Sequence, residues 1–186
     1  MKKLLEYGGI AASVLLIAFG VGATVVGFNG RDQVRSDLGR EQIVGTPDST
    51  IPNQLVNTGS EAQAFAKVMR KHTLEATGGK TYAQMPRFAT ADGKGTNDEK
   101  AALTKSGRPV DNPARNIWVT ETALSTALKT AYFAESTATF VIVMGIAMFL
   151  TGIGFLVLTL GVLRGPAAVK EKSRTSPVKE AVAVPH

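Results

Sequence analysis

The segment Ser136–Leu163, STATFVIVMGIAMFLTGIGFLVLTLGVL, contains 28 residues and no charged side chain. A second uncharged run, Gly8–Phe28, contains 21 residues. At a helical rise of about 1.5 Å per residue, each run is long enough to cross the roughly 30 Å hydrocarbon core of a bilayer. The 107 residues between them carry 26 of the 36 charged side chains and too few large apolar residues to enclose two apolar helices. We therefore predict an all-α membrane protein with transmembrane helices over residues 8–28 and 136–163.

The first apolar run also resembles a secretory signal peptide. A basic start precedes it, and Val21-Gly22-Ala23 offers small residues at which a signal peptidase cuts. Cleavage after Ala23 would leave a mature protein with one C-terminal span. The run is longer than the core of a usual signal peptide, however, and it stays apolar through Phe28. We favour an uncleaved membrane anchor.

Charge distribution predicts the orientation. Short cytoplasmic flanks are enriched in Lys and Arg, whereas long segments are translocated largely regardless of their charge. Residues 29–135 contain 14 basic and 12 acidic residues, so this long segment is nearly balanced. We predict a plasma-membrane protein with residues 1–7 and a disordered tail, residues 164–186, in the cytoplasm and residues 29–135 outside. The basic residues that set this topology, or contact lipid headgroups, are Lys2, Lys3, Arg164, Lys170, Lys172 and Arg174.

Turn residues dominate the start of the extracytoplasmic segment. They predict an extended or loosely turned chain over residues 29–58, with at most a short helical turn near residues 32–41. A helix is predicted over residues 60–77, because Ser60 and Gln63 form a capping-box pattern and two glycines follow at positions 78 and 79. The residues of this helix that we expect to form an interaction face recur at helical spacing: Phe65, Val68, Met69 and His72.

Two more helices are predicted before the second apolar run. The first covers residues 97–105, with Thr96 and Glu99 as cap partners, and it follows a hairpin turn at residues 92–95. The second covers residues 113–135, because Asn112-Pro113 places a cap residue before a proline at the first helical position. No helix-breaking residue follows before residue 163. This helix should therefore continue from water into the membrane as one rod of about 75 Å.

Small residues recur at every seventh position of this long helix. Small side chains let two helix backbones approach closely, which is how helices associate in lipid. The pattern predicts a packing seam, made either against the first span or between copies of the protein. Its members are Ala131, Ala138, Gly145 and Gly152, followed by Thr159, and a second set of small residues comprises Ala147, Gly154 and Gly161.

The sequence offers little for catalysis or for metal binding. It contains no Cys, and its two histidines are His72 and the last residue, His186. A non-haem iron site needs two His and a carboxylate, and the neighbouring Arg70 and Lys71 oppose a cation at His72. No nucleophile elbow, phosphate loop or calcium loop is complete. We predict no catalytic residue, no metal and no cofactor. Basic residues are dispersed among acidic ones, which argues against nucleic acid as a partner.

Three short stretches, NTGSEAQAFA at residues 57–66, HTL at residues 72–74 and GGKTY at residues 78–82, form a block. This block resembles one that recurs in a family of small actinobacterial membrane proteins. The resemblance implies two spans flanking an extracytoplasmic segment, and it carries no known catalytic residues. Some members of that family bear the label of aromatic ring-opening dioxygenase, which the shortage of metal ligands in this sequence contradicts.

These patterns predict a structural or accessory role. We expect an integral membrane protein that presents the helices over residues 60–77 and 113–135 to a protein partner or to further copies of itself. Ionisable residues within the spans are typical of transporters and channels, and here both apolar runs lack them. A membrane-bound enzyme or a pore-forming oligomeric subunit remains the alternative.

Overall fold

The computed structural model describes residues 2–163 of the 186-residue chain, and it is mostly helical. Three long helices dominate: α1 (Lys2–Arg40), α2 (Gly59–Ala76) and α3 (Pro113–Leu158), with a π-helical turn, η3 (Thr159–Leu163), after α3. Between α2 and α3 lie two 3₁₀ turns and a short antiparallel hairpin: η1 (Tyr82–Gln84), η2 (Glu99–Ala101), β1 (Thr104–Lys105) and β2 (Arg108–Pro109). The predicted tail, with Arg164, Lys170, Lys172 and Arg174, lies outside the described residues.

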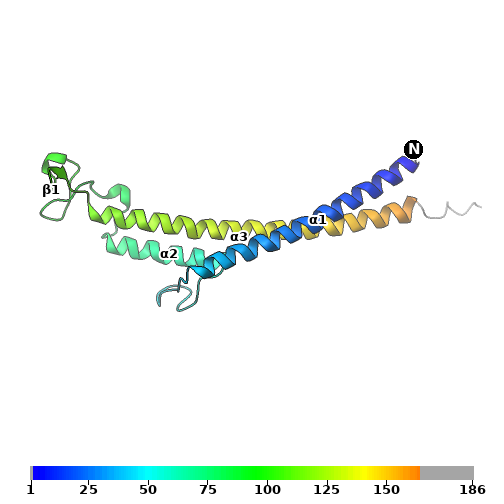
Figure 1. Ribbon diagram of the computed structural model, residues 1–186, viewed down its shortest axis with the longest axis horizontal. Helices are drawn as coiled ribbons and strands as arrows, with labels where there is room; N and C mark the ends of the chain where they lie inside the picture. Colours follow the sequence, from blue (N-terminus) through cyan, green and yellow to red (C-terminus); the bar gives the residue numbers. More distant parts are fainter. Residues whose placement is uncertain (1, 164–186) are drawn as a thin grey trace, which may run out of the picture.

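The helices form one elongated body around α3. Helix α1 runs antiparallel to α3, and α2 lies along the other half of α3 (Figure 1). Residues 78–112, which we call the head, sit at the N-terminal end of α3. The N-terminus of α1 and the C-terminal end of α3 lie together at the opposite end (Figure 1).

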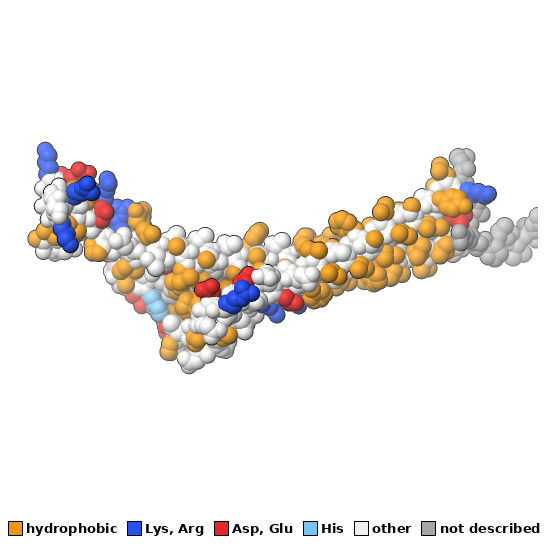
Figure 2. Space-filling view, viewed as in Figure 1, with side chains coloured by type: hydrophobic (Ala, Val, Ile, Leu, Met, Phe, Trp, Pro, Cys, Tyr) orange, Lys and Arg blue, Asp and Glu red, His pale blue; other side chains and the backbone are white. Residues whose placement is uncertain are grey.

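Both α1 and α3 are long and apolar enough to cross a membrane. Helix α3 begins at the predicted position, with the Asn112 side chain accepting a hydrogen bond from the backbone N–H of Ala114 and Pro113 at the first helical position. It then continues without interruption through Leu158. A helix of 46 residues is about 69 Å long. Figure 2 shows hydrophobic side chains over the half of the pair that contains the two uncharged runs.

Helix α1 is longer than the sequence predicts. The prediction of an extended chain over residues 29–58 is wrong for residues 29–40, which continue α1. Val34 and Leu38 explain the difference, because they are one helical turn apart and both pack in the core of the three-helix region. This tertiary burial outweighs the turn preference of Asn29-Gly30. The loop that follows, residues 41–58, is closed by a bridge between Val44 and Leu55.

Helix α2 begins slightly earlier than predicted. Thr58 is the N-cap and forms the capping box with Glu61, in place of Ser60 with Gln63. The Glu61 carboxylate accepts hydrogen bonds from the backbone N–H groups of Asn57 and Thr58, both at 2.9 Å. A charged acceptor forms stronger hydrogen bonds with these N–H groups than the neutral Gln63 amide would form with the N–H of Ser60. The left-handed Gly78 and Gly79 follow the C-terminal end, as predicted.

The helix predicted over residues 97–105 does not form. The structure has one 3₁₀ turn, in which Asp98 accepts a hydrogen bond from the backbone N–H of Lys100, and then strand β1. Leu103 explains the difference. Its N–H donates to the carbonyl of Ala89 at 2.9 Å, and its carbonyl accepts from Val110 at 2.8 Å. These long-range backbone hydrogen bonds hold the segment extended.

Candidate functional site

The seam residues of α3 face α1 within the same chain. A Cβ atom added to Gly145 would lie 2.8 Å from the carbonyl oxygen of Gly20, and one added to Gly20 would lie 2.7 Å from that of Gly145. A Cβ on Gly152 would lie 3.0 Å from the carbonyl oxygen of Ser13. The two backbones therefore touch at these positions, and any larger side chain would force the helices apart.

The remaining seam residues continue this register. Ala138 lies opposite Gly27, at which an added Cβ would be 3.0 Å from the Ala138 carbonyl oxygen. Ala131 packs against the core of the three-helix region. At the opposite end of the seam, Thr159 lies against Gly9. The second set of small residues faces away: Ala147 is exposed, and an added Cβ at Gly154 or Gly161 would meet nothing within 4 Å.

Helix α1 carries a matching set that the sequence analysis missed. Ser13, Gly20 and Gly27 are buried and stand seven residues apart, the same spacing as on α3. Ser13 is fully buried, and its hydroxyl donates to the carbonyl of Gly9 at 2.7 Å, so it needs no partner on α3. Their seven-residue spacing is visible in the first apolar run, and it could have predicted that these residues face α3.

Glu135 joins all three helices where the uncharged run of α3 begins. Its Oε1 accepts a hydrogen bond from Arg35 Nε of α1 at 2.6 Å, and its Oε2 accepts one from the backbone N–H of Gly59, the first residue of α2. The Glu135 side chain is only 11% exposed, whereas that of Arg35 is 44% exposed. A carboxylate at a helix N-terminus also interacts favourably with the helix dipole. Glu135 therefore fixes α2 relative to the other two helices.

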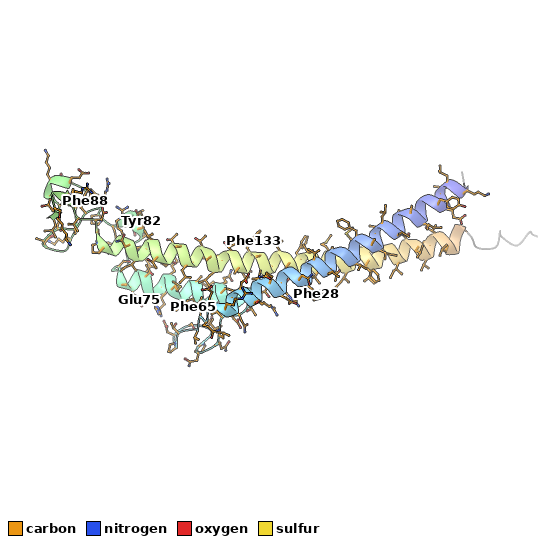
Figure 3. The ribbon with its side chains drawn as sticks, viewed as in Figure 1. Phe28, Phe65, Glu75, Tyr82, Phe88 and Phe133 are labelled. Atoms are coloured by element: carbon orange, nitrogen blue, oxygen red, sulfur yellow. The ribbon has the colours of Figure 1, made fainter. Side chains whose placement is uncertain are left out.

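The residues predicted to form an interaction face on α2 are used inside the chain. Val68 is buried, and Phe65 and Met69 pack against the core formed by Leu38, Val56, Ala62, Ala66 and Leu128. Figure 3 shows Phe65 where α2 approaches the end of α1. This face therefore closes the three-helix region.

His72 forms a contact with the loop after α1. Its Nε2 lies 2.9 Å from Oδ2 of Asp48, which also accepts a hydrogen bond from Lys71 Nζ at 2.9 Å and one from Thr46 on its other oxygen. The hydrogen bonds from Lys71, His72 and Thr46 hold the pKa of Asp48 far below its usual value, and the same carboxylate raises the pKa of Lys71. In residues 2–163, no His, Asp and Glu side chains gather in threes as a metal site would require.

The head is fastened to α3 by Trp118. This side chain is 3% exposed, and its indole N–H donates to the carbonyl of Lys80 at 2.9 Å and to the hydroxyl of Thr77 at 3.2 Å. Inside the head, Phe88 is buried and pairs in both directions with the backbone of Thr96 at 2.9 Å. The head is therefore a folded unit with a fixed attachment. No protein-family model, curated protein or solved structure matches this chain.

Proposed function

We propose that this protein is an integral membrane protein of structural or accessory type, which holds its head outside the membrane as an interaction module. In this proposal, the apolar halves of α1 and α3 cross the plasma membrane as an antiparallel pair. Both termini lie in the cytoplasm, and residues 29–135 lie outside. The seam joins α1 to α3 within one chain, so a single copy forms a complete membrane hairpin.

Exposure of the apolar surface supports the membrane assignment. A core helix of a soluble protein is mostly buried, but only 11% of the most apolar window of α1 and 17% of that of α3 are buried. Phe19 is 67% exposed and Phe140 is 63% exposed. Water disfavours so large a continuous apolar surface, whereas lipid tails accommodate it.

Retention of the first span is supported by the seam. Ser13 and Gly20 contact α3 and Gly9 contacts η3, and all three precede the position after Ala23 at which a signal peptidase would cut. Removing them would expose the Gly145 and Gly152 backbone to lipid without a partner helix. Lys3 on the N-terminal side and the nearly balanced charge of residues 29–135 support the orientation.

The observation that carries the proposal is the continuity of α3 from the head into the apolar pair. From Glu135 to Pro113 the helix rises about 33 Å at 1.5 Å per residue. Helix α2 and the end of α1 pack along this part and are fixed to it by Glu135 and the core around Leu128. This supported part of α3, which we call the rod, places the head at a fixed distance from the membrane surface.

Site-specific photocrosslinking in intact cells tests this role. A photoreactive amino acid would replace Lys100 or Arg108 in the head, and Phe133, which is 70% exposed on the rod, serves as the matched control. We expect one discrete adduct, of the same size from both head positions and absent from position 133. Equal adducts from all three positions, or adducts from position 133 alone, would contradict the head as the interaction module.

A further inference from the structure

A cavity of about 480 Å³ lies where the head joins α3. Figure 3 shows Tyr82, one of its residues, beside the start of α3. The lining is mainly polar and comes from η1, from the segment before the buried Phe88, and from the cap and first turns of α3. These residues are Tyr82, Arg87, Asp111, Asn112, Arg115 and Asn116, and Val119 of α3 completes the lining. This cavity is separate from the seam and from the Glu135 junction.

Two guanidinium groups in this cavity lack an acidic partner. Among the described residues, neither Arg87 nor Arg115 forms an ion pair, although Asp111 is also part of the lining. The Nε atom of Arg115 is buried and has no hydrogen-bond partner in residues 2–163. A buried charged donor without a partner is costly, so a ligand that supplies an acceptor would relieve a cost already present in the fold.

The surrounding structure holds both arginines in place. The guanidinium of Arg115 stacks over the ring of Tyr82, with its carbon 4.0 Å from the ring centre. The backbone N–H of Arg87 donates to Asn97 Oδ1 at 2.9 Å, and its carbonyl accepts from the backbone N–H of Asn112 at 2.8 Å. The Asn112 side chain also donates to the carbonyl of Pro86 at 3.0 Å. The Arg87 guanidinium lies over the Phe88 ring, with its carbon 4.9 Å from the ring centre. Both arginine side chains are therefore restrained before a ligand binds and lose less freedom on binding.

The electrostatics around the cavity favour an anion. Residues 78–116 contain seven Lys and Arg against four Asp and Glu, and basic side chains are visible on the head in Figure 2. An excess of positive charge raises the local concentration of anions. The planar guanidinium fork matches the oxygens of a phosphate or a carboxylate.

We propose that this cavity binds an oxyanion carried on a hydroxylated body, that is, a phosphorylated or carboxylated sugar. Arg87 and Arg115 hold the anionic group. The cavity is much larger than one phosphate or carboxylate group, so the remainder of the ligand occupies it as well. Asp111 and Asn116 supply acceptors and donors for hydroxyl groups, and the Tyr82 ring supplies a flat apolar wall. The proposal depends on the proposed function in one respect, since the ligand meets the head outside the cell only in that orientation.

Calorimetric titration of the full-length protein in an uncharged detergent tests the inference. The probes are glucose 6-phosphate and glucuronate, which distinguish the phosphorylated source from the carboxylated one, and glucose, which lacks the anionic group. We expect saturable binding of at least one of the two anions and none of glucose. Arg115→Gln should weaken binding by about tenfold or more, the effect of losing one charge-assisted contact. Arg87→Gln, which leaves the Tyr82 stack intact, should weaken it as well.

The matched control is Arg108→Gln, which removes an equal charge from the hairpin outside the cavity. It should leave the affinity within about twofold of the unaltered protein. Absence of saturable binding of both anions up to about 10 mM would overturn the inference. An equal loss in the Arg108 variant would also overturn it, because binding would then follow overall charge. Since titration in detergent does not depend on orientation, failure here leaves the membrane topology and the crosslinking result standing.

Discussion

Replacing Gly145 by leucine should separate the two long helices. An added Cβ at this position would lie 2.7 Å from the backbone nitrogen of Thr24 and 2.8 Å from the carbonyl oxygen of Gly20. Carbon contacts are normally about 3.5–4.0 Å, so the Cβ alone must retreat by about 1 Å, and the rest of the leucine requires more. Because backbone atoms cannot rotate aside, the helices must move. Overpacking of this kind costs about 1–3 kcal/mol.

Spin labels on lipid-facing positions of the two helices measure this separation. Phe19 on α1 and Leu150 on α3 are 67% and 60% exposed, so labels there disturb few contacts. In bilayers, Gly145→Leu should lengthen or broaden the distance distribution between the labels, and it should lower the detergent concentration at which the pair comes apart. Gly154→Leu is the matched control, because nothing lies within 4 Å of an added Cβ there. Identical distributions for the two variants would refute close backbone packing between α1 and α3.

Three further changes probe the region outside the apolar pair. Glu135→Gln should destabilise the three-helix region by about 1–3 kcal/mol, measured as a lower thermal midpoint, because Arg35 and the α2 N-terminus lose their charged acceptor; an unchanged midpoint would contradict this junction. The hydrogen bond from Lys71 is the chief cause that lowers the pKa of Asp48. The ionised Asp48 carboxylate therefore stabilises the folded loop above its unfolded pKa of 3.8, and this stabilisation is lost as pH falls through the lowered pKa. Amide exchange in residues 41–58 should therefore stay slow at about pH 4 and be faster at that pH in Asp48→Asn; equal rates would refute the contact. Trp118→Phe should remove the indole N–H that donates to the Lys80 carbonyl, at a cost of about 0.5–1.5 kcal/mol, while the Thr77 hydroxyl keeps its contact with that carbonyl. Faster exchange over residues 78–84 would report the loss, and unaltered exchange would argue against this attachment.

Local signals predicted the parts of the fold that local chemistry determines. The uncharged run of residues 136–163 predicted the apolar half of α3, and Asn112-Pro113 predicted where α3 begins. The sequence analysis placed the N-cap of α2 at Ser60, two residues too late, because it did not consider the charged acceptor that Glu61 offers to Thr58. The extension of α1 to Arg40 depends on burial of Leu38 against the other helices, which a turn-forming dipeptide does not reveal.

The candidate site was harder to predict because its contacts join distant residues. Arg35 and Glu135 are 100 positions apart, and nothing in either neighbourhood marks them as partners. The pairing of Arg115 with Tyr82 depends on how the head folds back onto α3, which a short 3₁₀ turn and two-residue strands determine. The seven-residue spacing on α3 was visible in the sequence. That the seam packs against α1 of the same chain became clear only from the antiparallel register of the two helices.

Accessibility labelling in intact cells tests the central claim most directly, because the chain contains no cysteine of its own. A membrane-impermeant maleimide would be applied to Ser106→Cys, at the exposed turn of the head hairpin, and to Ser173→Cys in the C-terminal tail. We predict that the cysteine at position 106 is labelled in intact cells and that the one at position 173 is labelled only after the membrane is opened. Labelling of both positions in intact cells, or of position 173 alone, would contradict an antiparallel pair that crosses the membrane with its head outside.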